Sequence, residues 1–202
     1  LTGRYPFRHG NQRHRGSLIE PDRLTLGSLM RQAGYHTACI GKWHLGLGPN
    51  EQEPVAGERF PAGPVDRGFD SYFGIPASLD IPPYYFVEND TPVALPTATV
   101  AGSQSEGWSP IQGAFWRSGA AAPGFEHAAV TPTLLSRAGQ YLQTAARQDS
   151  PFFLYLALPS PHTPWVPTEA FRGSSQAGLY GDFVEQVDAG LGQLLAQLDS
   201  LG

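Results

Sequence analysis

The feature that most constrains the fold is an unbroken apolar run at residues 152–158, FFLYLAL, which lies between Pro151 and Pro159. A strand without alternating polar residues has no face suited to water, so both of its faces are expected to be covered. Strands of this kind are typical of parallel sheets whose connections are helices. The run therefore predicts a fully buried, parallel strand.

Helical patterns lie on both sides of this run. Apolar residues recur at helical spacing over 131–145 and again over 180–198. Residues 21–34 also indicate a helix, with a proline suited to its first turn and a glycine at its end, and the β-prone segment 36–40 follows. This order of helices, strands and loops predicts an α/β fold, with a mostly parallel sheet flanked by helices.

The composition bounds the organisation of the chain. Its 202 residues, 41% hydrophobic and 15% charged, are enough for one sizeable core. We expect a single, partial domain over 1–202 with a loop-rich insertion at 91–130, where Ala, Gly, Ser and Pro dominate. No apolar run of about 18 residues occurs, so no transmembrane segment is predicted. Neither end resembles a terminus, because no secretory signal or initiator Met is present and a helical pattern is still running near the last residue. We expect an internal piece of a longer protein.

Charge is unevenly spread along the chain. Residues 1–45 hold seven basic residues against two acidic ones, a net of +5 within a chain of net −5. A basic segment in an acidic chain suits a local anion site, although a solvated basic face explains the charge equally well. Nucleic acid is not an expected partner, because no basic stripe recurs and no aromatic residues interleave with the basic ones.

Two segments that follow predicted strands carry side chains suited to chemistry. Ligands of open α/β sheets bind beyond the carboxyl ends of strands, where Lys42 and His44 follow one strand and His162 the other. Lys42 is the only lysine beside twelve arginines, and its compact ammonium suits a small oxyanion. Residues two apart in an extended segment share a face, so Lys42 and His44 are expected to point into one cavity while Trp43 packs behind. His162, on a loop stiffened by prolines, is a candidate general acid.

We predict that these three side chains converge on one cavity. Each also has an ordinary explanation: chance for the single lysine, a hydrogen-bonded structural histidine for His44, and a surface loop histidine for His162.

Other chemically capable residues lack such a context. Cys39 lies in an apolar stretch and is expected to be a buried, inert thiol. Surface or structural roles are expected for the remaining histidines, which are His9, His14, His36 and His127. The carboxylates are scattered, and no spacing typical of zinc, EF-hand, phosphate-loop or serine-hydrolase motifs is present. No residue of this chain is therefore assigned to a metal.

Four blocks, and a helix that follows them, resemble the type I sulfatase family in the order in which that family has them. Residues 1–10, LTGRYPFRHG, resemble the segment that follows the signature C/S-x-P-S-R-x-x-L-L-T-G-R. Residues 34–46, GYHTACIGKWHLG, match the second family signature almost throughout, and 68–80, GFDSYFGIPASLD, resembles the next segment. Residues 151–164, PFFLYLALPSPHTP, are similar to the family's strand and histidine loop, and the helix at 180–195 also fits. The likeness is weakest over 91–130.

The resemblance implies an alkaline-phosphatase-like α/β fold and hydrolysis of a sulfate monoester of carbohydrate or aryl type. In that family, a cysteine or serine oxidised to formylglycine attacks sulfur, and calcium with basic side chains stabilises the charge. Carried over by position, Lys42 would bind the sulfate and His44 would hold the formylglycine hydroxyl and assist its deprotonation. Ser78 would contact the sulfate region, and His162 would bind there and protonate or orient the leaving oxygen.

The resemblance also implies what this chain lacks. The formylglycine precursor and the calcium ligands would lie outside residues 1–202, so Ca²⁺ is expected only in the full-length protein and residues 1–202 alone are expected to be inactive. A periplasmic, secreted or lysosomal location is implied by the family. No feature of the chain predicts an oligomeric state.

Two other functions remain open on the residues alone. One is a phosphate-ester hydrolase or phosphotransferase of the same superfamily, which would also need an anion site. The other is a catalytically inactive relative that binds carbohydrate. The aromatic residues Tyr84, Tyr85 and Phe86 suit stacking on a sugar ring, and they suit core packing equally well.

Overall fold

The computed structural model describes residues 1–5, 16–48, 54–107, 109 and 111–202. These residues form two compact units. The sheet unit comprises residues 1–77, 85–95 and 148–157, and the helical unit comprises 78–84, 96–147 and 158–202. The expectation of a single domain over 1–202 stays a prediction. Arg8, Arg13, Arg15, His9 and His14 lie outside the described residues.

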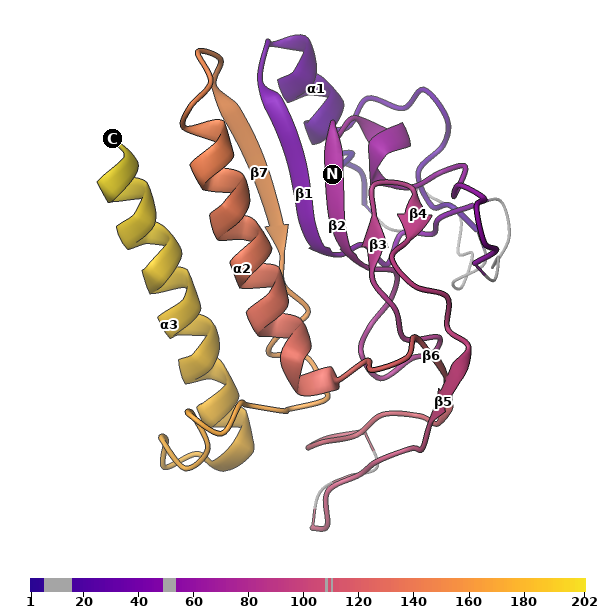
Figure 1. The fold of residues 1–202 in the computed structure, drawn as a ribbon, viewed down its shortest axis with the longest axis vertical. Coiled ribbons are helices and arrows are strands. Elements are labelled where there is room, and N and C mark those ends of the chain that lie inside the picture. Colours follow the sequence, from indigo (N-terminus) through magenta and orange to yellow (C-terminus); the bar gives the residue numbers. More distant parts are fainter. Residues whose placement is uncertain (6–15, 49–53, 108, 110) are drawn as a thin grey trace. The chain divides into compact units, whose positions relative to one another are not determined.

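The sheet unit is built on three parallel strands, β1 (His36–Lys42), β2 (Ser71–Ile75) and β7 (Phe152–Ala157) (Figure 1). Two short antiparallel strands, β3 (Val87–Glu88) and β4 (Thr91–Pro92), complete the order β4-β3-β2-β1-β7. The expected α/β class with a mostly parallel sheet is therefore confirmed. Because β1 lies between β2 and β7 and runs parallel to both, the carboxyl ends of the three strands meet at one edge of the sheet.

The first helix begins later than the sequence pattern predicts. Helix α1 covers Leu26–Gln32, and Thr25 is its N-cap. The Thr25 hydroxyl accepts a hydrogen bond from the Ser28 amide at 3.0 Å, and the Ser28 hydroxyl accepts one from the Thr25 amide at 2.9 Å. This reciprocal capping box satisfies two amides at the start of the helix, so the helix begins after Thr25 and not at the proline four residues earlier.

The last parallel strand is less buried than its apolar run predicts. All six residues of β7 are half-buried, which corrects the expectation of a fully covered strand. The reason is its position, since within the described residues β7 lies at the edge of the sheet and pairs with β1 along one side. The core of the sheet unit includes Cys39 of β1, which is fully buried, and Phe69, which stacks against Phe153 and Tyr155 of β7 with ring centroids 6.4 and 6.1 Å apart.

The helical unit contains two long helices that lie side by side (Figure 1). Helix α2 spans His127–Ala145, which includes the predicted 131–145, and α3 spans Gly178–Leu201. The predicted apolar stripe of α3 is divided between two environments. Phe183 and Leu194 are buried and Val187 is half-buried, whereas Val184, Leu191, Leu195 and Leu198 are exposed.

The segment expected to be a loop-rich insertion, 91–130, contains paired structure in its described residues. Strands β5 (Ala98–Val100) and β6 (Gly119–Ala121) form an antiparallel pair, and Ser103 and Trp116 form a bridge beyond it. Helix α2 already begins within this segment. Whether 91–130 is an insertion stays a prediction.

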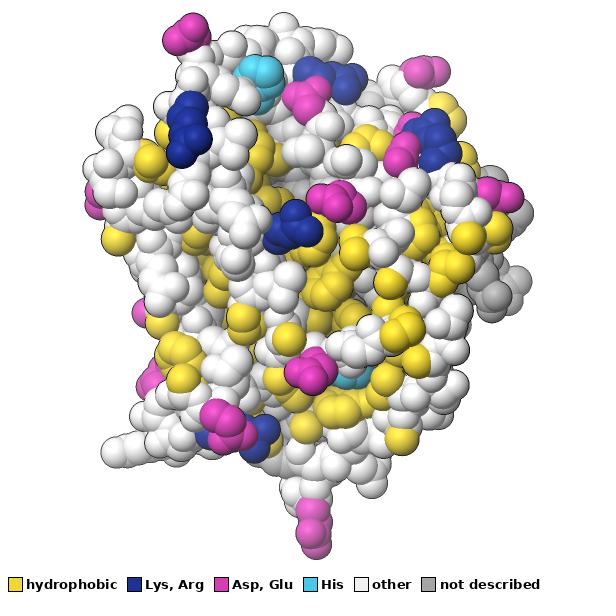
Figure 2. Space-filling view, viewed as in Figure 1, with side chains coloured by type: hydrophobic (Ala, Val, Ile, Leu, Met, Phe, Trp, Pro, Cys, Tyr) yellow, Lys and Arg dark blue, Asp and Glu magenta, His cyan; other side chains and the backbone are white. Residues whose placement is uncertain are grey.

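Basic side chains on the described surface are frequently paired with acidic ones. On the face shown in Figure 2, several Lys or Arg side chains lie directly beside Asp or Glu. Arg59, for example, bonds Asp66 at 2.7 Å and Asp90 at 2.9 Å. Among the described helices, none has the length and apolar character needed to cross a membrane.

Candidate active site

The turn that follows β1 carries the first two predicted site residues. Lys42 is the last residue of β1, and the pairing with β2 continues beyond it: the Trp43 amide donates to the Ile75 carbonyl at 3.0 Å and the His44 amide to the Pro76 carbonyl at 2.9 Å. We call residues 42–46 the β1 turn. Its backbone is thus bonded to β2 and to the residue after β2.

Burial alternates along this turn as predicted, but the backbone does not stay extended. Trp43 is buried, with 4% of its surface exposed, whereas Lys42 and His44 on either side are half-buried. His44 adopts a φ of 52°, in the left-handed region that residues other than glycine rarely enter. The argument that residues two apart share a face therefore does not apply to His44. Backbone strain of this kind is concentrated at functional sites, where the surrounding structure holds it in place.

The strands approach one another closely beneath the turn. Gly41 has a φ of 129°, and a Cβ placed on it would lie 2.0 Å from the carbonyl oxygen of Ala157 in β7. A Cβ on Gly74 in β2 would lie 1.7 Å from the carbonyl oxygen of Gly41. Neither position can hold a side chain without moving the backbone of a neighbouring strand, so Lys42 leaves the sheet from a tightly defined point.

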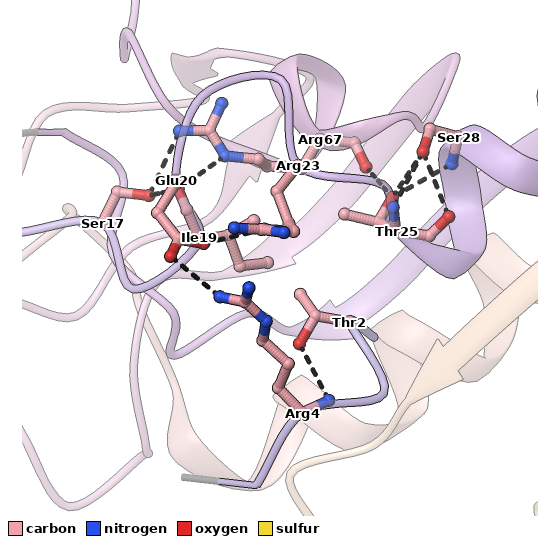
Figure 3. A network of polar contacts seen from close by, with 9 residues as sticks. All are labelled: Thr2, Arg4, Ser17, Ile19, Glu20, Arg23, Thr25, Ser28 and Arg67. Carbon is pink, nitrogen blue, oxygen red and sulfur yellow. Dashed lines mark hydrogen bonds and ion pairs between the residues drawn. The ribbon is translucent and has the colours of Figure 1, made fainter. Parts of the chain in front are cut away.

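A polar network in the sheet unit holds the segment around Ser17 and Ile19 in place (Figure 3). The buried Arg67 guanidinium donates to the Ile19 carbonyl at 3.1 Å and to the Ser17 hydroxyl at 3.3 Å. The segment that Arg67 holds in this way bonds the β1 turn directly, because the Leu18 amide donates to the Leu45 carbonyl at 2.8 Å. Within the turn, the Trp43 indole N–H donates to the Gly46 carbonyl at 2.9 Å.

Several arginines of the basic segment are paired with carboxylates. Glu20 bonds both Arg4 and Arg23, each at 3.2 Å, and these contacts hold the pKa of Glu20 below its usual value (Figure 3). Arg31 lies 3.9 Å from Asp70. For these three arginines, the explanation of the basic segment as a solvated, paired surface is therefore the better one.

The other two predicted site residues belong to the helical unit. Ser78 is buried, and two residues further on Asp80 forms an ion pair with Arg117 at 2.7 Å. Arg117 also donates to the backbone carbonyl of Asp80 at 3.0 Å. Within the described residues, the second carboxylate oxygen of Asp80 is buried without a hydrogen-bond partner. Pattern reasoning missed the Asp80–Arg117 pair, because 37 residues separate its members.

His162 lies on the loop of residues 159–167, which we call the His162 loop, and its side chain is exposed. Its Nδ1 lies 2.8 Å from the Thr163 carbonyl, so Nδ1 carries the proton and donates it to that oxygen. The loop is anchored on both sides of the histidine. The hydroxyl of Ser160 shares a hydrogen bond with that of Thr131 in α2, and the Trp165 amide donates to the Gly113 carbonyl at 2.8 Å.

The structure brings Lys42 and His44 together on one turn of the sheet unit. Ser78 and His162 lie in the helical unit, and their predicted convergence with Lys42 and His44 stays a prediction. His36, which is exposed, begins β1 at the opposite end from Lys42.

Surface or structural roles are expected for His127, and the structure gives it the structural one. It is the first residue of α2, has 6% of its surface exposed, and stacks on Trp116 with ring centroids 4.2 Å apart. The rings of Tyr84 and Phe125 contact it edge-on. Burial lowers the pKa of His127 to about 4, against the opposing effect of a hydrogen bond to the Leu79 backbone. His127 is therefore neutral at ordinary pH.

The aromatic residues considered for sugar stacking are mostly part of the core. Tyr84 and Tyr85 each expose 2% of their surface, and burial raises the pKa of Tyr84 to about 12. Phe86 stacks on Phe73 with ring centroids 5.2 Å apart. Cys39 is buried as expected, and burial raises the pKa of its thiol.

The carboxylates of the described residues do not fit a calcium site. Ca²⁺ needs six to eight oxygen ligands, and no group of three or more His, Cys, Asp or Glu residues is gathered within the described ranges. Asp66, Asp80 and Asp90 are bonded to arginines, and Asp182 accepts the amides of Gly173 and Ser175. No chemical step is therefore assigned to calcium held by these residues.

The chain is similar over its whole length to known proteins. The family model described as Sulfatase matches residues 1–202, the whole of the chain. The chain belongs to the sulfatase family. The N-acetylgalactosamine-6-O-sulfatase of Bacteroides thetaiotaomicron is 30% identical over 232 residues, covering all of this chain and 45% of that protein. Human arylsulfatase A is 33% identical over 214 residues, covering all of this chain and 38% of that protein.

A solved structure extends this likeness to the fold. The structure comes from work on the metabolism of multiple glycosaminoglycans by Bacteroides thetaiotaomicron, and it matches with a TM-score of 0.83 at 28% identity. The match covers all of this chain and 48% of that one. The sulfatase-family chain thus has the expected alkaline-phosphatase-like fold, and it spans less than half the length of these relatives.

Proposed function

We propose that the full-length protein containing this chain hydrolyses sulfate monoesters, with Lys42 and His44 at its active site. The observation that carries the proposal is the β1 turn, where a single lysine and a strained histidine stand at the carboxyl edge of a parallel sheet in a sulfatase-family chain. An ammonium held at a bonded strand end is suited to stabilising charge on sulfate oxygens without reorganising during the reaction.

The proposed roles follow from the placement of each side chain. Lys42 binds the sulfate oxygens, and His44 holds the hydroxyl of the nucleophile and assists its deprotonation. The family likeness assigns that nucleophile to a formylglycine outside residues 1–202. Ser78 contacts the sulfate region, where its burial supports a positioning contact.

His162 is proposed to bind at the sulfate and to protonate the leaving oxygen. Its Nδ1–H is already directed to the Thr163 carbonyl, which orients the ring and leaves Nε2 as the nitrogen that gains and gives the proton. That hydrogen bond is available in both the neutral and the cationic form of the ring, so proton transfer at Nε2 does not disturb it.

For the substrate we propose a sulfated saccharide before an aryl sulfate. Support comes from the named activity of the Bacteroides thetaiotaomicron relative, an N-acetylgalactosamine-6-O-sulfatase. Calcium bound by residues outside this chain and a periplasmic, secreted or lysosomal location are proposed on the same family likeness.

The decisive experiment uses full-length protein matured by a formylglycine-generating system. We would measure kcat/KM against a 6-O-sulfated amino sugar and against 4-nitrophenyl sulfate. Lys42→Arg is expected to lower kcat/KM by roughly a hundredfold to a thousandfold, because a planar guanidinium replaces a compact ammonium beside a tetrahedral anion. Near-normal activity of Lys42→Arg would refute the proposed role of the lysine.

His162→Ala separates proton donation from sulfate binding. It is expected to harm hydrolysis of the sugar sulfate more than that of 4-nitrophenyl sulfate, because only the alkoxide leaving group needs a proton. Equal losses on both esters would leave His162 with a binding role alone. His36→Ala, at the other end of β1, is the matched control and should leave both rates near normal.

The alternatives predict other results in the same assays. A phosphate-ester hydrolase would turn over 4-nitrophenyl phosphate in preference to the sulfates, and an inactive relative would bind the sulfated sugar without hydrolysing it. Residues 1–202 alone are expected to have no sulfatase activity and no micromolar calcium binding by calorimetry. Detecting sulfatase activity or micromolar calcium binding in residues 1–202 would count against the proposal.

A further inference from the structure

Tyr72 is a buried tyrosine of β2 that sequence reasoning left unassigned. It exposes 2% of its surface, and in the sheet it lies opposite Cys39 of β1. Its side chain extends along the sheet toward the carboxyl edge. The hydroxyl reaches two backbone oxygens there, that of Gly41 in β1 at 3.1 Å and that of Ile75 in β2 at 3.0 Å.

These two carbonyls are the ones that define where the β1 turn begins. Gly41 directly precedes Lys42, and the Ile75 carbonyl also accepts the amide of Trp43 at 3.0 Å. A hydroxyl has one proton, so Tyr72 donates to one of the two oxygens at a time or shares its proton between them. One side chain thereby ties the ends of two parallel strands at Gly41, which precedes Lys42 in the chain, and at Ile75, which lies opposite Lys42 in the sheet.

The surroundings leave room for this hydroxyl and little room for anything else. A Cβ on Gly74 would lie 2.7 Å from the Tyr72 hydroxyl and 1.7 Å from the Gly41 carbonyl oxygen, so glycine at 74 is what allows the contact. Burial raises the pKa of Tyr72 well above its usual value, with smaller contributions from Cys39 and Tyr85. The hydroxyl thus keeps its proton and remains a donor at any working pH.

We propose that Tyr72 is a positioning residue of the active site, whose hydroxyl fixes the strand ends from which Lys42 and His44 project. The role rests on the proposed function of Lys42 and His44, through which Tyr72 acts. The hydroxyl touches neither substrate nor nucleophile. A displacement of about 1 Å at such a point can cost roughly a hundredfold in rate, so a small contact at the base of the turn has a large effect at its tip.

The test uses the full-length, matured protein and Tyr72→Phe, which removes one oxygen and keeps the ring. Tyr85→Phe, also a buried tyrosine of the sheet unit, is the matched control. Tyr72→Phe is expected to lower kcat/KM for a sulfate ester by between about tenfold and a hundredfold, and to raise the inhibition constant of inorganic sulfate, while Tyr85→Phe changes either value by less than about threefold. Normal kinetics in Tyr72→Phe would overturn the proposal.

A double-mutant cycle distinguishes positioning from a general loss of stability. If Tyr72 acts through Lys42, then Tyr72→Phe should change the rate by less than about threefold once Lys42 is replaced by alanine. Effects that multiply both in this cycle and in the matching cycle with His44→Ala would overturn the proposal, because they would show that Tyr72 acts independently of both side chains.

Amide hydrogen exchange provides a readout that does not require activity. Tyr72→Phe should speed the exchange of the Trp43 and His44 amides, which bond the Ile75 and Pro76 carbonyls, and Tyr85→Phe should not. Unchanged exchange in Tyr72→Phe would overturn the positioning role even in an active enzyme. If the wild-type protein hydrolyses no sulfate ester, but Tyr72→Phe still speeds the exchange of the Trp43 and His44 amides, the proposed function is refuted and the structural link between Tyr72 and the β1 turn stays intact.

Discussion

The β1 turn and the His162 loop present their histidines in opposite ways. In the β1 turn, the backbone of every residue from Trp43 to Gly46 either donates or accepts a hydrogen bond, and His44 is half-buried with a strained φ of 52°. In the His162 loop the anchors lie on either side, at Ser160 and Trp165, and His162 itself is exposed.

This difference matches the two kinds of chemistry proposed for them. A histidine that holds the hydroxyl of the nucleophile and assists its deprotonation is most effective when it is held in place before the reaction, because no energy is then spent on reorganisation. A group that protonates a leaving oxygen meets substrates of different shape, so anchoring the flanks while leaving the side chain exposed suits that task. If the β1 turn is more rigid than the His162 loop, substitutions that disturb the turn should have larger effects than substitutions that disturb the loop.

The largest effect is expected from Gly41→Ala. A Cβ there would lie 2.0 Å from the Ala157 carbonyl oxygen at a φ of 129°, so the added methyl group must push β1 and β7 apart. We expect the free energy of unfolding, measured by urea denaturation, to fall by about 4 kcal/mol. The control is Gly173→Ala in the helical unit, where φ is 74° and no atom lies within 4 Å of the new Cβ, and a loss of only about 1 kcal/mol is expected. Equal losses would contradict the contrast between the regions.

Arg67→Ala should have the next largest effect, because it removes the brace beside the β1 turn. The buried guanidinium donates to the Ile19 carbonyl, the Ser17 hydroxyl and the Asp66 carbonyl, and its loss leaves one buried and two partly buried acceptors without this donor. We expect a loss of about 3 kcal/mol by urea denaturation, with faster exchange of the Leu18 amide. Arg172→Ala, which removes an exposed pair with Glu169, should cost less than about 0.5 kcal/mol. A comparable cost for both variants would show that Arg67 is not a brace.

The helical unit should be the more sensitive of the two to acid, because of His127. The pKa of His127 is about 4 in the folded protein against an ordinary value of 6.5, so between these pH values the unfolded chain binds a proton that the folded protein does not. Stability should therefore be complete above about pH 6.5 and fall as the pH drops toward 4, by on the order of 2 kcal/mol. The measurement is urea denaturation from pH 7.5 to 4.5 for wild type and His127→Gln. The difference in the free energy of unfolding between wild type and His127→Gln should narrow as the pH falls. If the two free energies fall in parallel with pH, His127 is excluded as the cause of the acid sensitivity.

The smallest effect is expected from Thr131→Val, which cuts one anchor of the His162 loop. The variant leaves the buried Ser160 hydroxyl without its partner in α2, and the expected cost is about 1 kcal/mol. Hydrolysis of the sugar sulfate should slow by less than about tenfold, because the Trp165 anchor remains. Thr133→Val, whose hydroxyl bonds the Ala129 carbonyl within the same helix, is the control and should stay within about 0.5 kcal/mol of wild type. A larger loss of activity than in Tyr72→Phe would reverse the proposed ranking of the two regions.

The class of the fold and the candidate residues of the β1 turn can be predicted from the amino-acid sequence alone. The apolar run at 152–158 and the helical patterns over 131–145 and 180–198 predict elements that the structure contains. Lys42 and His44 were found because they follow a strand immediately. These signals are legible because periodicity and strand ends depend on residues that are neighbours in the chain.

Features that depend on contacts between distant residues become visible only in the folded chain. The edge position of β7 makes a strand of apolar residues only half-buried, and Arg67 meets Ile19 across 48 positions. Tyr72 reaches Gly41 across 31 positions, and His127 becomes neutral only because three aromatic rings cover it. A sequence states which donors, acceptors and apolar surfaces exist, but which of them meet is settled when the chain packs, because burial and hydrogen bonding are properties of the assembled neighbourhood.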